Sequence, residues 1–354
     1  MKNGNLIYIN LIIKIKNVIK YIMKIIIHLI GNIKQGTGHV YRMLRLTNRC
    51  FSSTGFLGKN NIIFILNKNE KLAINILKKN NINCIKYKNL DELYNILSKT
   101  SSDVIINDCL NTTKELTYNQ KKYTNKVINF EDYGDGVNNA DIVINSFYNN
   151  NIINGDKIYT GLKYTLLSPL LSNSVESTFN TIPQKLILTF GGSDPSNIIE
   201  YILKLLINND INKKIHILVI LGIGYIYKTK IMNLIENHTN ISISIDEQNM
   251  IGQFQTSDIA VTSCGCAMFE SCYFLLPTIC ISHNEREVLH TQLCPNNTII
   301  NLGLFENLNN KLFINKLNLL IDSKKKREFI RKNMIYIRNE IKNSYKNVFD
   351  LIFK

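Results

Sequence analysis

Residues 24–42 read KIIIHLIGNIKQGTGHVYR, and this stretch decides the fold. A short β-branched run leads into a glycine-rich turn, Gly36-Thr37-Gly38-His39, and a helical pattern starts at Val40. This succession is typical of the strand–loop–helix unit that opens an α/β nucleotide-binding domain. Glycines let the backbone approach a ligand, and a helix N-terminus behind them favours negative charge. The turn is therefore either a ligand site containing a proton-accepting histidine or an ordinary tight turn with an exposed one.

The alternation of strands and helices continues through the first half of the chain. Apolar runs predict strands at 24–30, 62–66, 84–87, 103–107, 127–130 and 142–144, with helices at 40–50, 70–79 and 91–97. The pattern lapses between Pro169 and Pro183, and we interpret residues 166–183 as a linker. It then restarts with strands at 185–190, 215–221, 241–245, 259–262 and 278–281, and with helices between them.

Short apolar strands that alternate with helices indicate parallel sheets covered on both faces. We therefore predict an α/β protein with two doubly wound Rossmann-like domains that face each other across a cleft. The predicted parts are a leader at 1–22, a first domain at 23–165, the linker at 166–183, a second domain at 184–325 and a helical segment at 326–354. Ligands of such sheets bind beyond the carboxyl ends of the strands, so we expect the site in the cleft.

Composition narrows the class of protein. The chain has 354 residues, of which 45% are hydrophobic and 19% charged, which is typical of a soluble globular protein. Its net charge is +15, but the basic residues are scattered and no basic patch is interleaved with aromatic side chains, so we predict no nucleic-acid partner. The eight cysteines form no CxxC pair, which predicts no zinc site. A soluble α/β chain of this size predicts a cytoplasmic location with reduced thiols.

The first 22 residues precede the first strand. Residues 6–22 are apolar but interrupted by Lys14, Lys16 and Lys20, and they lack the length of a membrane span. We expect Met23 to be the functional start and the leader to be dispensable. The alternative is a basic amphipathic segment that makes weak peripheral contact with a membrane surface.

Two glycine motifs follow strands of the second domain. Gly191-Gly192-Ser193 comes directly after the strand at 185–190, and Asp194 or Ser196 can cap the next helix. Free N–H groups and a helix dipole at such a turn suit a phosphate, although a capped turn without a ligand has the same sequence.

The second of these motifs is residues 263–270, SCGCAMFE, after the strand at 259–262. Backbone amides near Gly265 can hold a diphosphate. Glu270, on the following helix, can accept hydrogen bonds from the two hydroxyls of a ribose, and we expect it at the cleft rather than in a core. A solvent-facing helical glutamate is the alternative.

Further polar groups also fall at strand ends. Asn284 and His290 follow the strand at 278–281, Asp108 ends a strand of the first domain, and Asp132 follows another. Each is either a cleft residue or part of a polar loop.

Taken in order, six segments resemble the SpsG/PseG-like family, named for spore-coat polysaccharide biosynthesis. They are Gly36–Arg42, Asn129–Gly136, Ala140–Asn145, Thr189–Asn197, Ser263–Glu270 and Asn284–His290. The family includes the UDP-2,4-diacetamido-2,4,6-trideoxy-β-L-altropyranose hydrolase of the pseudaminic acid pathway. The resemblance implies a GT-B glycosyltransferase-like fold. Cys266 and Ala267 stand where the family more often has arginine and threonine.

The resemblance also implies a role for each matching residue. His39 would lie at the anomeric carbon and activate water, with Asn284 holding the sugar or the diphosphate. Substrate-binding residues would be Gly36, Gly38, Arg42, Asp108 and Asp132 in the first domain. UDP-binding residues would be Gly191, Gly192, Ser193, Gly265 and Glu270 in the second.

The predicted function is hydrolysis of the anomeric C–O bond of a UDP-amino-sugar, which releases UDP and free sugar for nonulosonic acid and surface polysaccharide biosynthesis. We expect neither a cofactor nor a metal. One alternative is a UDP-sugar-dependent glycosyltransferase, in which a sugar acceptor replaces water. The other is a protein that binds nucleotide sugars without turning them over.

Overall fold

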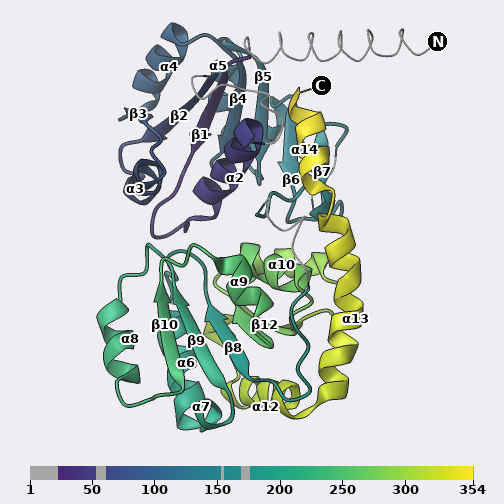
Figure 1. The fold of residues 1–354 in the computed structure, drawn as a ribbon. Helices are drawn as coiled ribbons and strands as arrows, with labels where there is room; N and C mark the ends of the chain where they lie inside the picture. Colours follow the sequence, from purple (N-terminus) through teal and green to yellow (C-terminus); the bar gives the residue numbers. More distant parts are fainter. Residues whose placement is uncertain (1–22, 53–60, 153–154, 169–175, 354) are drawn as a thin grey trace, which may run out of the picture.

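Two parallel sheets organise the chain (Figure 1). The computed structural model describes residues 23–52, 61–152, 155–168 and 176–353. The predicted leader at 1–22 and residues 169–175 of the predicted linker lie outside the described residues. No helix in the described part of the chain is both long enough and apolar enough to cross a membrane.

The first sheet has seven strands in the order β3-β2-β1-β4-β5-β6-β7. Its strands are β1 (Ile25–Leu29), β2 (Ile62–Asn67), β3 (Cys84–Tyr87), β4 (Ser102–Asp108), β5 (Thr124–Phe130), β6 (Ile142–Asn145) and β7 (Ile158–Thr160). The helices are α2 (Gly38–Ser52), α3 (Lys71–Lys79), α4 (Leu90–Lys99) and α5 (Lys114–Gln120). The strands at 25–29 and 102–108 pair in the centre, with Leu29 beside Asp108.

The second sheet has six strands in the order β10-β9-β8-β11-β12-β13. Its strands are β8 (Lys185–Thr189), β9 (His216–Leu221), β10 (Ile241–Ile245), β11 (Ile259–Thr262), β12 (Thr278–Ser282) and β13 (Ile300–Leu304). The helices are α6 (Ile198–Asn208), α7 (Ile211–Lys214), α8 (Lys228–Ile235), α9 (Met250–Gln255), α10 (Cys266–Tyr273), α11 (Glu285–His290) and α12 (Asn310–Asp322).

In both sheets the first six strands follow the same spatial order, third-second-first-fourth-fifth-sixth, which is the doubly wound Rossmann arrangement. The two predicted doubly wound domains are therefore confirmed. Strand burial explains the apolar runs: all five residues of β1 are buried, including His28. Burial lowers the pKa of His28 to about 4, and its ring is bonded on both sides, to Asn107 and to the Tyr87 hydroxyl.

The C-terminal helices connect the two domains. Helix α13 (Lys324–Ile341) runs along the second domain, and α14 (Ser344–Phe353) returns to the first (Figure 1). Val348 and Ile352 of α14 are buried in the same apolar cluster as β1. The segment predicted as helical at 326–354 is thus formed by two helices, and α13 begins at Lys324, two residues before the predicted start. The end of α14 completes the core of the first domain.

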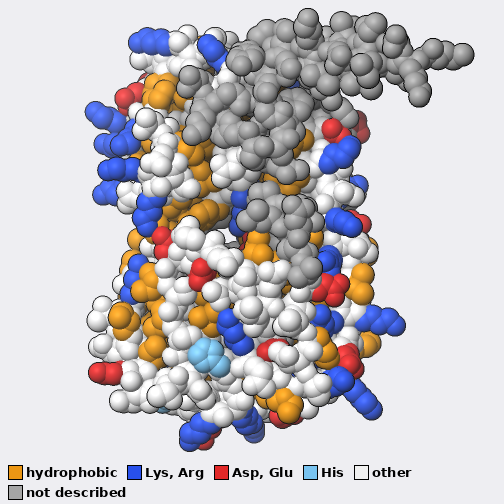
Figure 2. Space-filling model, viewed as in Figure 1, with side chains coloured by type: hydrophobic (Ala, Val, Ile, Leu, Met, Phe, Trp, Pro, Cys, Tyr) orange, Lys and Arg blue, Asp and Glu red, His pale blue; other side chains and the backbone are white. Residues whose placement is uncertain are grey.

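Charged side chains are distributed over the surface of both domains. Figure 2 shows Lys and Arg side chains along the outline of both domains on this face rather than gathered in a single patch. This distribution agrees with the scattering of basic residues in the sequence.

Candidate functional site

A cavity of about 720 Å³ lies between the two domains. It is lined by residues that follow β1, β4, β5 and β6 in the first domain and β8, β9, β10, β11 and β12 in the second. These residues come after the carboxyl ends of the strands, where ligands of doubly wound sheets bind. The volume falls in the range of small-molecule sites in proteins.

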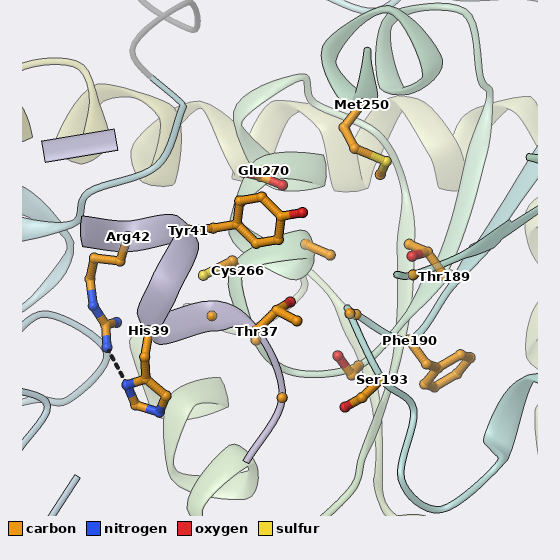
Figure 3. A pocket seen from close by; sticks show the side chains of 18 of the residues that line it. Thr37, His39, Tyr41, Arg42, Thr189, Phe190, Ser193, Met250, Cys266 and Glu270 are labelled. Atoms are coloured by element: carbon orange, nitrogen blue, oxygen red, sulfur yellow. Dashed lines mark hydrogen bonds between the residues drawn. The ribbon is translucent and has the colours of Figure 1, made fainter. Parts of the chain in front are cut away.

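His39 is a titratable group of the first-domain wall, and a buried carboxylate fixes its ring. It is the second residue of α2, and the turn before it requires glycine at Gly36, whose φ is +80°. The His39 Nδ1 atom lies 2.6 Å from a carboxylate oxygen of Asp108. It also lies 3.2 Å from an Arg42 nitrogen (Figure 3). With the Nδ1 proton donated to Asp108, the Nε2 atom is the proton acceptor of the ring.

Asp108 is fully buried at the end of β4 and joins His39 to Arg42. The Arg42 Nε and Nη2 atoms donate to its two carboxylate oxygens at 2.8 and 2.7 Å. Burial alone would raise the pKa of Asp108, but Arg42 and His39 hold that pKa below its usual value. The carboxylate is therefore ionised and fixes both side chains.

This geometry changes two sequence-based expectations. Asp108 does not line the cavity, so it orients His39 instead of contacting a substrate. Arg42 lines the cavity, but its Nε and Nη2 atoms are engaged by Asp108. Gly36 and Gly38 do line the cavity, and a Cβ at Gly38 would meet nothing within 4 Å.

Asp132 lies behind the cavity wall, and the expectation that it contacts a substrate needs correction. Its carboxylate is fully buried, and it accepts hydrogen bonds from Thr112, Asn129 and the Gly134 amide. Thr112 belongs to the loop after β4, Asn129 to β5 and Gly134 to the loop after β5, so Asp132 holds these two loops together. Burial raises the pKa of this carboxyl.

The second-domain wall begins with Gly191, Gly192 and Ser193, which all line the cavity. A Cβ at Gly192 would lie 1.8 Å from the Thr37 hydroxyl oxygen, so this glycine permits close approach of the two domains. The predicted cap is confirmed, since Asp194 accepts hydrogen bonds from the amides of Ile198 and Ile199 at 2.9 Å.

Gly265 and Glu270 line the cavity from the start and the middle of α10. No side chain caps this helix at Gly265. Glu270 is more buried than expected, with 8% of its surface exposed. Its carboxylate lies 2.9 Å from the Arg45 guanidinium of the first domain, so this ion pair crosses the cleft. Burial raises the pKa of Glu270, and Arg45 opposes that rise.

Asn284 lines the cavity and caps α11, because its side chain accepts a hydrogen bond from the Glu287 amide at 3.1 Å. Two residues further on, Arg286 donates to the Glu131 carbonyl and to Asn111 across the cleft. His290 is buried, and burial lowers its pKa to about 4. It lines the cavity, and its ring contacts the Cys264 carbonyl and the Tyr148 hydroxyl.

Sequence reasoning missed several residues of the cavity wall. Arg45 is one helical turn after Arg42 on α2, and that spacing places both on one face. Residues 246–251 follow β10 and include the start of α9, and the strand-end rule that found the other loops also applies to them. Glu131 and Phe147 line the first-domain wall, and only Glu131 falls inside a segment that the sequence had singled out.

No family model matches the chain. Among curated proteins, it is similar to the uncharacterized protein MJ1062 of Methanocaldococcus jannaschii, at 27% identity over 279 residues. The alignment covers 74% of this chain and 56% of that protein, so the chain spans about half the length of this relative.

Solved structures share the fold across nearly the whole chain. Acinetobacter baumannii MurG superposes with a TM-score of 0.62 at 11% identity, covering 93% of this chain and 99% of that one. WaaG, a glycosyltransferase involved in lipopolysaccharide biosynthesis, gives 0.56 at 9% identity, covering 93% and 99%. The UDP-GlcNAc 2-epimerase of Neisseria meningitidis bound to UDP-GlcNAc gives 0.52 at 13% identity, covering 93% and 99%. These likenesses confirm the predicted GT-B glycosyltransferase-like fold.

Proposed function

We propose that this GT-B protein is a UDP-sugar hydrolase of the SpsG/PseG-like type, which acts on a UDP-amino-sugar in surface polysaccharide or nonulosonic acid biosynthesis. The observation that carries the proposal is the His39–Asp108 pair. It places an oriented imidazole in the wall of the inter-domain cavity, opposite the glycine loops of the second domain. No other described histidine of the cavity wall has a carboxylate within 3 Å of its ring.

The reaction follows from the tautomer that Asp108 selects. His39 Nε2 takes a proton from water as the water oxygen forms a bond to the anomeric carbon. The bond between that carbon and the β-phosphate oxygen breaks, and its electron pair leaves with UDP. A positioned general base contributes about 10²–10⁴-fold to such a step.

The second-domain wall, together with Arg45 of the first domain, would hold the leaving group. Arg45 and the uncapped N-terminus of α10 at Gly265 supply positive charge where the diphosphate gains negative charge. Glu270 would accept hydrogen bonds from the ribose with the same carboxylate that pairs with Arg45. That carboxylate would then be shared between Arg45 and the nucleotide. UDP-GlcNAc is bound by the structurally similar Neisseria meningitidis epimerase, which supports a UDP-sugar as the ligand class.

Glycosyl transfer is the second candidate. It is favoured by the likeness to WaaG, which is a glycosyltransferase. The same cavity and the same base would then activate an acceptor hydroxyl in place of water. Binding without turnover remains the third alternative from the sequence.

The first prediction separates these reactions. We expect the purified protein to release UDP and free sugar from a UDP-amino-sugar without any added acceptor. The measurement is mass spectrometry of the products from a panel of UDP-amino-sugars, with boiled protein as the control. UDP release that depends on an added acceptor would favour the transferase, and UDP binding without any product would favour the binding protein.

The second prediction concerns Glu270. Replacing Glu270 by Ala should weaken UDP by about tenfold to a hundredfold, because one or two charge-assisted hydrogen bonds to the ribose are lost. Pyrophosphate should bind as well as before, since Arg45 and the α10 N-terminus remain. Calorimetry with the two ligands measures the difference.

Glu236→Ala is the matched control, because Glu236 is exposed and does not line the cavity. We expect it to change neither affinity. If Glu270→Ala weakens UDP and pyrophosphate equally, Glu270 acts only as the cross-cleft partner of Arg45 and does not bind the ribose.

A further inference from the structure

Glu131 has an unusual backbone conformation at the edge of the cavity. It directly follows β5, and its φ of +51° lies in the left-handed region that non-glycine residues rarely adopt. Its amide donates to the Ile144 carbonyl at 3.0 Å, and its carbonyl accepts from Arg286 at 3.1 Å. Contacts on both sides therefore fix this conformation, which aims the side chain in a defined direction. Such outliers cluster at ligand sites.

The two oxygens of the Glu131 carboxylate have different surroundings. Oε1 accepts hydrogen bonds from the Ser146 amide at 3.0 Å and the Ser146 hydroxyl at 2.5 Å, and an Arg42 nitrogen lies 3.6 Å away. Oε2 has no hydrogen-bond partner among the described residues, although Glu131 is only 3% exposed. A buried carboxylate oxygen without a partner is costly, and a ligand donor would relieve that cost.

The position of Glu131 indicates which part of a ligand would reach it. Glu131 lines the cavity from the first domain, whereas Gly265 and Glu270 line it from the second. Arg42 contacts both Asp108 and Glu131, so Glu131 lies in the same side-chain group as His39. Phe147 lines the cavity nearby, with the Arg42 guanidinium 5.9 Å from its ring centre.

The surroundings of the Glu131 carboxyl act on its pKa in opposite directions. Burial raises the pKa of Glu131, and the nearby Arg42 together with the Ser146 hydrogen bonds opposes that rise. A donor from a ligand would stabilise the ionised form further.

We propose that Glu131 Oε2 accepts a hydrogen bond from a substituent of the glycosyl group, either a hydroxyl or the N–H of an acylamino group. This inference rests on the proposed function, because it assumes that the glycosyl group lies beside His39. Glu131 is then a residue that selects sugars with a donor at one ring position. It rejects sugars without that donor, because its buried oxygen stays unpaired.

The test compares the contribution of the sugar to affinity in two variants. Calorimetry measures UDP, UDP-N-acetylglucosamine, UDP-N-acetylgalactosamine and UDP-glucose with the wild type, Glu131→Gln and Ser146→Ala. In Glu131→Gln the amide oxygen can keep the Ser146 bonds, which places an NH₂ donor where Oε2 was. We expect this variant to lose about tenfold to a hundredfold in affinity for at least one UDP-sugar, with UDP itself unchanged.

Ser146→Ala is the matched control, because it removes a partner of Oε1 and leaves Oε2 in place. We expect it to lower the melting temperature without a sugar-specific loss. If both variants lose stability alike and neither changes the affinity for any UDP-sugar relative to UDP, Glu131 is structural and the inference is overturned. Failure of the wild type to bind UDP at all would instead overturn the proposed function.

Discussion

Replacing His39 by alanine will lower the turnover of a UDP-sugar by about 10²–10⁴-fold, which is the contribution of a positioned general base. The affinity for UDP will stay near that of the wild type. The reason is spatial: His39 lies on the first-domain wall, whereas Gly265 and Glu270 lie on the second. Product assays at saturating UDP-sugar measure the turnover number, and calorimetry measures UDP binding.

His238→Ala is the matched control for this variant. His238 is half-buried in the second domain, does not line the cavity and contacts Asn212. We expect it to keep full turnover. Near-normal turnover of His39→Ala would remove this histidine from the mechanism, and a parallel loss of UDP affinity would show that it acts in binding instead.

The alternation of apolar runs was enough to predict both sheets, because buried parallel strands must be apolar on both faces. The sequence missed one strand of each sheet, β7 with three residues and β13 with five, and short helices such as α5 with seven. Such segments carry too few turns or residues to show a period, so their structure depends on packing that only the folded chain supplies.

Which side chains lie at strand ends could also be predicted, and His39, Asp108 and Glu270 were all found in this way. Their partners could not. His39 and Asp108 are 69 residues apart, and Arg45 and Glu270 are 225 residues apart. A strand end predicts the region of a residue, but hydrogen-bond pairing depends on side-chain directions set by the packing of α2 and α10.

Gly192 is a further residue whose neighbour could not be predicted from the sequence. The sequence indicates that this glycine allows close approach of its backbone to something. The structure shows that the neighbour is Thr37 of the other domain. The glycine therefore sets how closely the two walls of the cavity approach, whether or not a ligand contacts it.

Replacing Asp108 by alanine will have the largest effect on stability that we expect. It leaves the Arg42 guanidinium buried without its main partner, and breaking a buried pair in this way costs about 3–5 kcal/mol. The control is Glu328→Ala, which removes an exposed pair with Lys324 and should cost less than about 1 kcal/mol. Urea unfolding followed by circular dichroism compares the two variants, and equal losses would contradict the central role of Asp108.

The effect of Asp108 should also depend on pH in a defined direction. Arg42 and His39 hold the pKa of the folded carboxyl below its usual value of 3.8, even though burial opposes ionisation. Its contribution is then fully present above that value and is lost as the pH falls through the lower pKa of the folded protein. The difference in unfolding free energy between the wild type and Asp108→Ala should therefore be constant from pH 7 to pH 5 and narrow below pH 3.8. A difference that instead narrowed between pH 7 and pH 5 would mean that Asp108 takes up a proton at higher pH, and so could not hold His39 in the tautomer that the proposed hydrolysis requires.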